Sequence, residues 1–389
     1  MNILFVTQYD LANPDYGGPV FKVRYLSNYL ANLGHNVSVV TVDDGKDDVK
    51  HLQDLRDSLH DRVSTIRLKT LWRYRAITLN PSVFSVVQRQ VPTADIIHIF
   101  GFYDLLSPFV VRSARIHNVP YIIEPIGMFT PIVRSLLKKK IYHRLLGRRL
   151  VSEAECIIAT STQEKEELVS NGLKSQHIVI RRNGIDLSEF SNLPEHGQMR
   201  SRLGINPDER LLLYLSRLSS KKNPEMLMQV FAKLDLPKTK LVLAGPSESG
   251  YLDKLKLIRK ELELENDIIF TGPLFGDEKM SALVDADIFV LPSTNENFGN
   301  VIAESVAAGT PVVITNKCGI APYIKDRVGL TVSPKQQELQ QAIVTLLSDT
   351  SLYKKFELAC SDVAKEFSWD QPAASMEQLY KKILTSQLL

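Results

Sequence analysis

The sequence predicts an α/β protein made of two doubly wound domains, each built on a parallel sheet. Short apolar runs rich in β-branched residues alternate along the chain with longer amphipathic stretches, which is typical of successive strand–helix units. The runs form two series of about six. Between the series, from about 186 to 206, Pro194 and Gly197 interrupt the periodicity. We therefore predict domains at 1–190 and 191–374, with a helix at about 375–389 that packs back on the first domain.

The strands follow from these runs in chain order. In the first half we expect them at 3–6, 37–42, 95–100, 121–124, 156–160 and 178–181, with a helix at 20–33 after the first strand. In the second half we expect them at 211–216, 240–244, 268–271, 287–291, 311–314 and 329–332. An open α/β sheet binds ligands at the carboxyl ends of its strands, so the loops that follow these runs are the candidate sites.

Composition excludes several classes of protein. With 44% hydrophobic and 23% charged residues, the chain is typical of folded rather than disordered proteins. A net charge of +3 is too small to indicate a nucleic acid partner. The three cysteines, Cys156, Cys318 and Cys360, form no C-x-x-C pattern, so we expect no disulfide framework, no zinc site and a cytoplasmic location. We predict no signal peptide and no membrane-spanning helix.

The most informative stretch is 291–304, directly after a predicted strand. It combines a loop containing Gly299 with a helix that we expect to begin near Asn300, the predicted N-cap. The free backbone N–H groups and the positive end of such a helix suit a phosphate group. Glu296 precedes the helix and Glu304 lies in its first turns, so both carboxylates can face one ligand.

This Glu, seven residues, Glu pattern resembles that of the retaining glycosyltransferases of family 4, together with the 308–313 segment that follows it. Further similarities lie in both halves, so the resemblance covers nearly the whole chain. It implies the GT-B fold, in which two Rossmann-like domains face one another across a cleft. It also implies an enzyme that transfers a sugar from a nucleotide-diphosphate donor, UDP or GDP among them, to a glycan or lipid-linked acceptor.

The resemblance assigns a donor site. Glu296, Arg217 and Lys222 are its predicted catalytic residues, because an Arg and a Lys stabilise the charge on the leaving diphosphate without a metal ion. We expect no cofactor beyond the nucleotide sugar. The resemblance also implies a set of donor-binding residues. They are Gly17 and Gly18 in the loop after the first strand, Pro273 and Leu274 near the base, and Asn297, Phe298, Gly299, Asn300, Val301 and Glu304. Glu304 is expected to accept hydrogen bonds from the ribose and Glu296 from the sugar.

The chain departs from the family pattern at several points. Asn223 stands where a glycine usually follows the lysine. Phe100 and Ile126 replace polar residues that are frequent in the family, which leaves His98 and Glu124 as the candidate acceptor-side contacts. Residues 285–287 look like a metal-binding Asp-x-Asp, but they lie between a predicted helix and strand, so we predict no metal there.

The segment 134–150 carries seven basic residues with leucines and an isoleucine at helical spacing. It is either an ordinary surface helix or a basic amphipathic helix that rests on anionic lipid at the inner face of the membrane. Residues 1–190 hold 24 basic against 19 acidic residues, while 191–389 hold 23 against 25. The basic excess therefore belongs to the first domain.

Two other functions stay open at this point. One is a GT-B epimerase that acts on a free sugar nucleotide, and the other is a two-domain sugar-nucleotide binding or membrane scaffold protein without catalysis. An NAD-dependent dehydrogenase is a weaker alternative, since the turn after the first strand contains no G-x-G-x-x-G. The sequence does not choose the sugar, the base, the acceptor or the oligomeric state.

Overall fold

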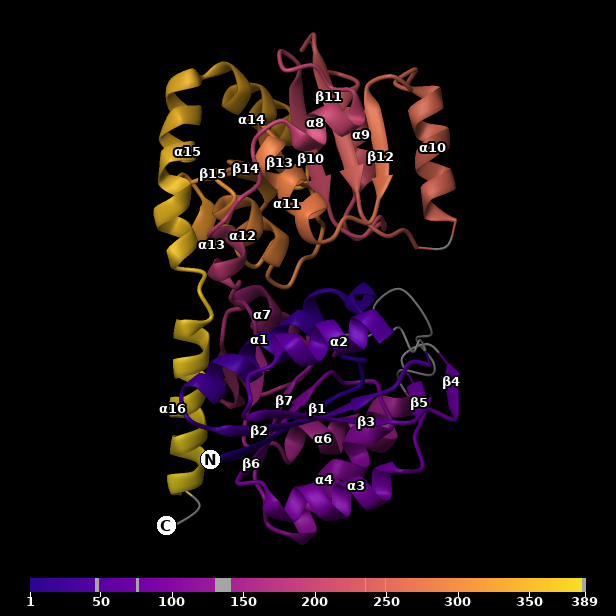
Figure 1. Cartoon of the computed structure of the whole chain (residues 1–389), viewed down its shortest axis with the longest axis vertical. Helices are drawn as coiled ribbons and strands as arrows, with labels where there is room; N and C mark the ends of the chain where they lie inside the picture. Colours follow the sequence, from indigo (N-terminus) through magenta and orange to yellow (C-terminus); the bar gives the residue numbers. More distant parts are fainter. Residues whose placement is uncertain (46–48, 75–76, 130–140, 235, 249, 387–389) are drawn as a thin grey trace. The chain divides into compact units, whose positions relative to one another are not determined.

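The computed structural model describes residues 1–389 apart from 46–48, 75–76, 130–140, 235, 249 and 387–389 (Figure 1). The chain divides into two compact units. Unit 1 comprises 1–184 and 369–389, and unit 2 comprises 185–368. Both divisions lie a few residues before the predicted ones at 190 and 374. The final helix, α16 (Asp370–Ser386), belongs to unit 1 and packs against α1 (Gly18–Asn32).

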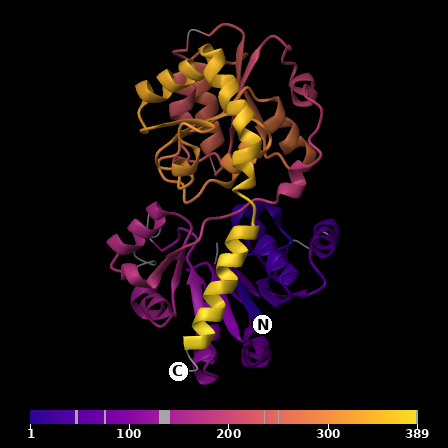
Figure 2. The same cartoon turned by 90° about the vertical axis from the view of Figure 1, so that its left-hand side faces the viewer.

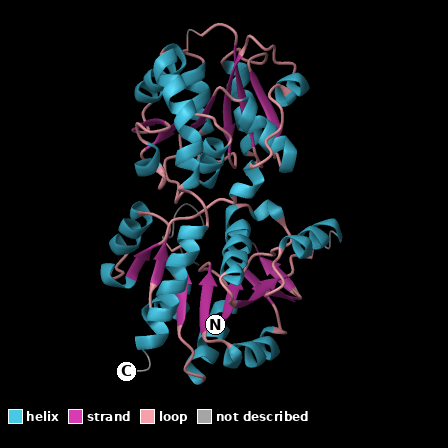
Figure 3. Cartoon of the chain, turned by 60° about the vertical axis from the view of Figure 1, so that its left-hand side comes forward, coloured by secondary structure: helices cyan, strands magenta, loops and turns pink. Residues whose placement is uncertain are grey.

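Unit 1 is built on a seven-stranded parallel sheet in the order β3-β2-β1-β6-β7-β8-β9. Helices cover both faces of this sheet (Figure 3). Its strands are β1 (Asn2–Thr7), β2 (Asn36–Val42), β3 (Val63–Leu68), β6 (Ile96–Phe100), β7 (Tyr121–Glu124), β8 (Ile157–Ala159) and β9 (Ile178–Ile180), with a separate antiparallel hairpin of β4 (Trp72–Tyr74) and β5 (Ile77–Leu79). Besides α1 and α16, its helices are α2 (Val49–Ser58), α3 (Val83–Gln90), α4 (Leu106–Ile116), α6 (Arg148–Ser152) and α7 (Thr162–Ser170).

The alternation of side chains along β1 explains how this sheet is stabilised. Ile3 and Phe5 point into one hydrophobic cluster, and Leu4 and Val6 point into another on the opposite face. The first cluster also contains Trp369 and the apolar residues of α16, so the last helix of the chain completes the core of the first unit (Figure 2).

Strand β3 was missed by the sequence prediction. Its sequence, Val63 to Leu68, mixes apolar with polar residues and is only partly buried, because the strand lies at the edge of the sheet. Continuous apolar runs are typical of central strands buried on both faces, and β3 has no such run.

Unit 2 contains a six-stranded parallel sheet in the order β12-β11-β10-β13-β14-β15. All six predicted strands are present. They are β10 (Arg210–Leu215), β11 (Thr239–Ala244), β12 (Ile268–Gly272), β13 (Ile288–Leu291), β14 (Val312–Thr315) and β15 (Gly329–Val332). The helices are α8 (Gln198–Leu203), α9 (Pro224–Phe231), α10 (Tyr251–Glu261), α11 (Gly276–Asp285), α12 (Asn300–Ala307), α13 (Ala321–Ile324), α14 (Gln336–Ser348) and α15 (Thr350–Lys365).

The strand order of unit 2 determines where its loops converge. β10 lies between β11 and β13, so the loops after β10, β11 and β13 leave neighbouring positions at the carboxyl edge of the sheet.

In the described part of the chain, no helix is both long enough and apolar enough to cross a membrane.

Candidate donor site

The loop between β13 and α12 holds the first predicted carboxylate. Gly299 caps α12 with a φ of 97°, a left-handed conformation that favours glycine. The cap is therefore Gly299 rather than Asn300, which is the first helical residue. A Cβ on Gly299 would lie 2.6 Å from Cδ1 of Ile302 and 3.3 Å from Cγ of Glu296. The glycine thus provides both the turn into the helix and the space beside the Glu296 side chain.

Backbone hydrogen bonds fix Glu296. Its N–H donates to the Lys317 carbonyl at 2.8 Å, and its carbonyl accepts from the N–H of Gly319 at 2.9 Å. The Glu296 carboxylate forms an ion pair with the ammonium group of Lys222, and both side chains are 17% exposed. The structure therefore brings together two of the three residues that were predicted to be catalytic, although they are 74 positions apart in the sequence.

The loop between β10 and α9 carries Lys222. The backbone N–H of Thr294 donates to the Lys221 carbonyl at 2.9 Å, which links this loop to the loop of Glu296. Asn223 caps α9 with a φ of 55°. Asparagine tolerates this left-handed conformation better than most residues, which accounts for its presence where the family usually has glycine.

Arg217, the third predicted catalytic residue, lies at the start of the same loop. Its side chain is exposed, and its carbonyl accepts a hydrogen bond from the Tyr214 hydroxyl at 3.0 Å. Burial raises the pKa of that tyrosine well above its usual value, so the hydroxyl stays protonated and able to donate. Arg217 therefore has an anchored backbone and a side chain open to solvent.

Gly245, which the sequence analysis did not single out, holds the β10 and β11 loops together. Its φ is 138°, and a Cβ there would lie 2.0 Å from the carbonyl oxygen of Ser216, the residue before Arg217. Across the same junction Leu218 donates its N–H to the Pro246 carbonyl at 2.8 Å. The available signal was a Gly-Pro pair directly after a predicted strand.

The other predicted donor contacts of unit 2 differ in exposure. Asn297 and Val301 are half-buried, and Pro273 is exposed. The side chains of Phe298 and Leu274 are 1% and 7% exposed and belong to the hydrophobic core, so only their backbone can contact a ligand.

Glu304 has a lysine partner of its own. The Lys279 ammonium, on α11, lies 3.0 Å from Oε2 of Glu304 on α12. Burial lowers the pKa of Lys279, but the carboxylates of Glu304 and, to a smaller extent, Glu189 more than offset this and raise the pKa above its ordinary value. The sequence analysis missed Lys279, because no motif marks a lysine in the first turn of a helix as a partner of a distant carboxylate.

In unit 1, Gly17 and Gly18 lie at the start of α1. Gly17 caps the helix with a φ of 64°, and Gly18 is the first helical residue. Apart from each glycine and its chain neighbours, no atom of the described residues lies within 4 Å of a Cβ built on either residue, so the space next to both glycines is open. The helix begins two residues before the predicted Val20.

His98 and Glu124 are fully buried, which is at odds with the acceptor-side contacts predicted for them. Glu124 binds the Lys22 ammonium at 2.5 Å and also pairs with Arg181, while Nδ1 of His98 lies 2.7 Å from the Tyr380 hydroxyl. Burial lowers the pKa of His98 to about 4. Although burial raises the pKa of Glu124, Arg181 and Lys22 bring it well below its ordinary value. His98 and Glu124 are therefore part of the interior of unit 1.

Comparison with known proteins agrees with this architecture. Residues 17–184 match the family described as "Glycosyl transferase 4-like domain", and residues 196–359 match "Glycosyl transferases group 1". The chain belongs to the GT4-type glycosyltransferases. Over 94% of both chains, this glycosyltransferase is 27% identical to an uncharacterized glycosyltransferase of Methanocaldococcus jannaschii. It is 28% identical to the alpha-monoglucosyldiacylglycerol synthase of Streptococcus pneumoniae, over 87% of this chain and 76% of that one.

Solved structures show the same fold. The sucrose-phosphate synthase of Thermosynechococcus elongatus matches with a TM-score of 0.77 and 24% identity, and the match covers 99% of this chain and 100% of that one. Anabaena HepE in complex with UDP-glucose matches with a TM-score of 0.76 and 21% identity, with the same coverage. These neighbours are GT-B glycosyltransferases, so this glycosyltransferase has the GT-B fold.

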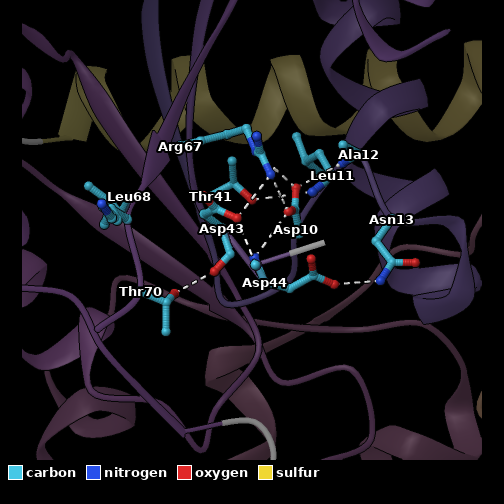
Figure 4. A network of polar contacts seen from close by, with 12 residues as sticks. Asp10, Leu11, Ala12, Asn13, Thr41, Asp43, Asp44, Arg67, Leu68 and Thr70 are labelled. Carbon is cyan, nitrogen blue, oxygen red and sulfur yellow. Dashed lines mark hydrogen bonds and ion pairs between the residues drawn. The ribbon is translucent and has the colours of Figure 1, made fainter. Parts of the chain in front are cut away.

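An acidic cluster lies at the carboxyl edge of the unit 1 sheet, where the loop after β1, which leads to Gly17, meets the loop after β2 (Figure 4). Asp10, Asp43 and Asp44 have carboxylate oxygens within 4.8 Å of one another. Both oxygens of Asp10 accept from Arg67, at 3.3 and 2.7 Å, and Arg67 also donates to Asp43 at 3.2 Å. Arg67 thus supplies the countercharge and connects β3 to this loop.

The structure describes only part of the basic segment. Of the basic segment 134–150, residues 134–140 lie outside the described residues. The remainder forms a π-helical turn, His143–Gly147, followed by α6.

The two aspartates considered as a metal motif accept hydrogen bonds from protein groups. Asp287 accepts from the Arg200 side chain at 2.7 Å, and Asp285 accepts from the Arg200 backbone N–H at 2.9 Å.

Proposed function

We propose that this glycosyltransferase transfers a sugar from a nucleotide-diphosphate donor to a hydroxyl of a glycan or lipid-linked acceptor, with retention of the anomeric configuration and without a metal ion. The observation that carries the proposal is the ion pair of Lys222 and Glu296 beside the N-terminus of α12. A cation, a carboxylate and the positive end of a helix in one place complement a sugar diphosphate.

Each group has a role in the proposed reaction. Arg217 and Lys222 bind the diphosphate and stabilise the negative charge that develops as the glycosidic bond breaks, which is the task of a metal ion in other transferases. The leaving phosphate then accepts the proton of the acceptor hydroxyl on the same face of the sugar. Glu296 accepts hydrogen bonds from the sugar hydroxyls, and Glu304 from the ribose.

The remaining donor contacts are made largely by backbone. In unit 2, the backbone at the start of α12 approaches the phosphates, while the loop of Pro273 and Leu274 faces the base. A contact made by backbone does not depend on the side chain present. Identification of the base therefore requires a binding measurement.

For the acceptor, we propose a hydroxyl of a glycan or of a lipid-linked molecule at the inner face of the membrane. Two observations support the lipid-linked form. One relative is named for a glucosyldiacylglycerol product. In addition, residues 1–190 carry more basic than acidic residues, and seven of the basic ones lie within 134–150. A basic surface is attracted to anionic lipid.

The donor is tested first by thermal unfolding with UDP-, GDP- and ADP-sugars, since a ligand that binds the folded state raises the melting temperature. Turnover of the stabilising donor is then followed by nuclear magnetic resonance, which reports the anomeric configuration of the product, with and without EDTA. We expect retention and unchanged turnover in EDTA. An inverted product, loss of activity in EDTA, or conversion of the donor without an acceptor would each refute a part of the proposal.

Variants test the site. We expect Glu296→Ala and Arg217→Ala to lower kcat by at least about 100-fold, the usual effect of removing a group that stabilises transition-state charge. Lys240→Met is the control. Lys240 also pairs with a carboxylate, Asp267 at 2.8 Å, but it lies near the amino end of β11, at the opposite edge of the sheet. Full activity of both site variants would refute the assignment.

Membrane association has its own assay. Flotation with vesicles that contain anionic lipid should carry the protein with the vesicles at low salt and release it at high salt. Reversing the charges of Arg144 and Arg148 should weaken the association. Binding that is absent, or that does not respond to salt, would contradict this part of the proposal.

A further inference from the structure

Both carboxylates of the Glu, seven residues, Glu pattern are paired with a lysine. Glu296 pairs with Lys222, and Glu304 pairs with Lys279 at 3.0 Å. The two side chains of the second pair are 20% and 21% exposed, so much of each is removed from solvent. Lys279 is not among the groups proposed above to contact the donor.

The position of Lys279 is unusual for a lysine. It is the fourth residue of α11, where the positive end of the helix disfavours a cation and where Asp277 and Glu278 are the expected residues. Burial disfavours the charge as well. Glu304, on the neighbouring helix α12, forms the ion pair with Lys279 and makes the largest contribution that favours its charge, and Glu189 adds a smaller one. The helix gives no reason for a lysine here, and the carboxylate of Glu304 does.

The two lysines must respond differently to a nucleotide. A diphosphate is an anion, so it competes with Glu296 for Lys222, and binding weakens that ion pair. A ribose is neutral, so it leaves the ion pair of Lys279 and Glu304 intact. Among the described residues, Lys279 is the one that binds the Glu304 carboxylate, and it does so through Oε2. The other oxygen, Oε1, stays available as an acceptor.

We propose that Lys279 is a positioning residue of the donor site, which holds Oε2 of Glu304 and directs Oε1 toward the ribose hydroxyls of the nucleotide. This inference rests on the proposed function. It does not make Lys279 a catalytic residue, because the lysine acts on the ribose only through Glu304. An arginine can replace it in part, whereas an uncharged side chain of similar length cannot.

The test measures dissociation constants by titration calorimetry for UDP, GDP and ADP, and then for the 2′,3′-dideoxy form of whichever nucleotide binds the wild type. We expect Lys279→Met to weaken binding of the ribonucleotide about tenfold and Lys279→Arg about threefold or less. The dideoxy nucleotide lacks the hydroxyls that Glu304 accepts from, so its affinity should be the same in the wild type and in Lys279→Met.

Lys240→Met is the matched control. Lys240 is 18% exposed and is also paired with a carboxylate, but it lies near the amino end of β11, away from the loops that follow β10 and β13. Thermal unfolding of each variant reports whether it folds. Equal affinity of wild type and Lys279→Met for the ribonucleotide overturns the inference, and so does an equal loss for both nucleotides. If the wild type binds no nucleotide, the proposed function fails and this inference fails with it.

Discussion

A substitution of Gly245 tests how closely the loops after β10 and β11 pack together. Replacing it with alanine adds one methyl group, which would lie 2.0 Å from the Ser216 carbonyl oxygen. That oxygen belongs to the backbone, so it cannot rotate away as a flexible side chain can. The alanine must also adopt a φ of 138°, which L-residues rarely do. The β10 and β11 loops have to separate to accommodate the change.

The size of the effect follows from what is lost. Separation of the loops strains or breaks the hydrogen bond from Leu218 to Pro246, at 2.8 Å, and that from Gly245 to Gly272, also 2.8 Å. Each contributes about 1 kcal/mol, and the strained backbone costs about 1–3 kcal/mol. We therefore expect Gly245→Ala to lower the free energy of unfolding by about 3–5 kcal/mol.

Gly309→Ala is the matched control. Its φ of 88° is also left-handed, but no atom lies within 4 Å of the added Cβ. We expect a loss of about 1–2 kcal/mol there, from the backbone conformation alone. The difference between the two variants isolates the close approach of the loops from the cost of a positive φ.

Urea unfolding followed by two probes locates the effect. Circular dichroism reports both units, whereas the two tryptophans, Trp72 and Trp369, both belong to unit 1. Gly245→Ala should shift the dichroism transition at least as much as the fluorescence transition. A loss below 1 kcal/mol, or one equal to that of Gly309→Ala, would falsify the close packing of these loops.

Three further predictions concern groups in both units. Burial lowers the pKa of His98 from 6.5 to about 4, so as the pH falls from 6.5 toward 4 the unfolded state binds a proton that the folded state does not. The wild type should lose up to about 3 kcal/mol relative to His98→Gln over this range, and urea midpoints whose difference is the same at pH 4.5 and pH 7 would contradict this. Asp10→Asn and Arg67→Met, each alone and combined, should show a coupling of about 1.5–3 kcal/mol in a double-mutant cycle, because Arg67 donates twice to a buried carboxylate; additive losses would refute it. Burial raises the pKa of Cys156, Cys318 and Cys360 to about 12, so Ellman's reagent should label none of them in the folded protein and all three in urea, and rapid labelling without urea would be inconsistent with these buried thiols.

Much of the fold was accessible from the sequence because its central strands are buried on both faces. Continuous apolar runs such as that of β11 therefore stand out from the helices around them, and all six strands of unit 2 were predicted. Edge strand β3 was missed because only part of it is buried, so polar residues are tolerated along it. Burial, rather than strand formation itself, is what the apolar pattern records.

The candidate site was accessible only in part. Glu296 and Glu304 lie close together in the sequence, and Lys222 follows Arg217 by five residues, so these groups leave a local signal. The acceptor-side prediction for Glu124 lacked such a signal. The structure places this glutamate between Lys22 and Arg181, inside unit 1.

The sequence by itself determined the two parallel α/β domains and indicated candidate residues in the loops after β10 and β13, because hydrophobic periodicity and short motifs are local properties of the chain. Tertiary structure alone decided the partners of the charged groups. It pairs Lys279 with Glu304 and Lys222 with Glu296, and it buries Glu124 in an ion cluster. Ion pairing depends on distances of a few ångströms between side chains of different elements, and strand order sets these distances rather than separation along the chain.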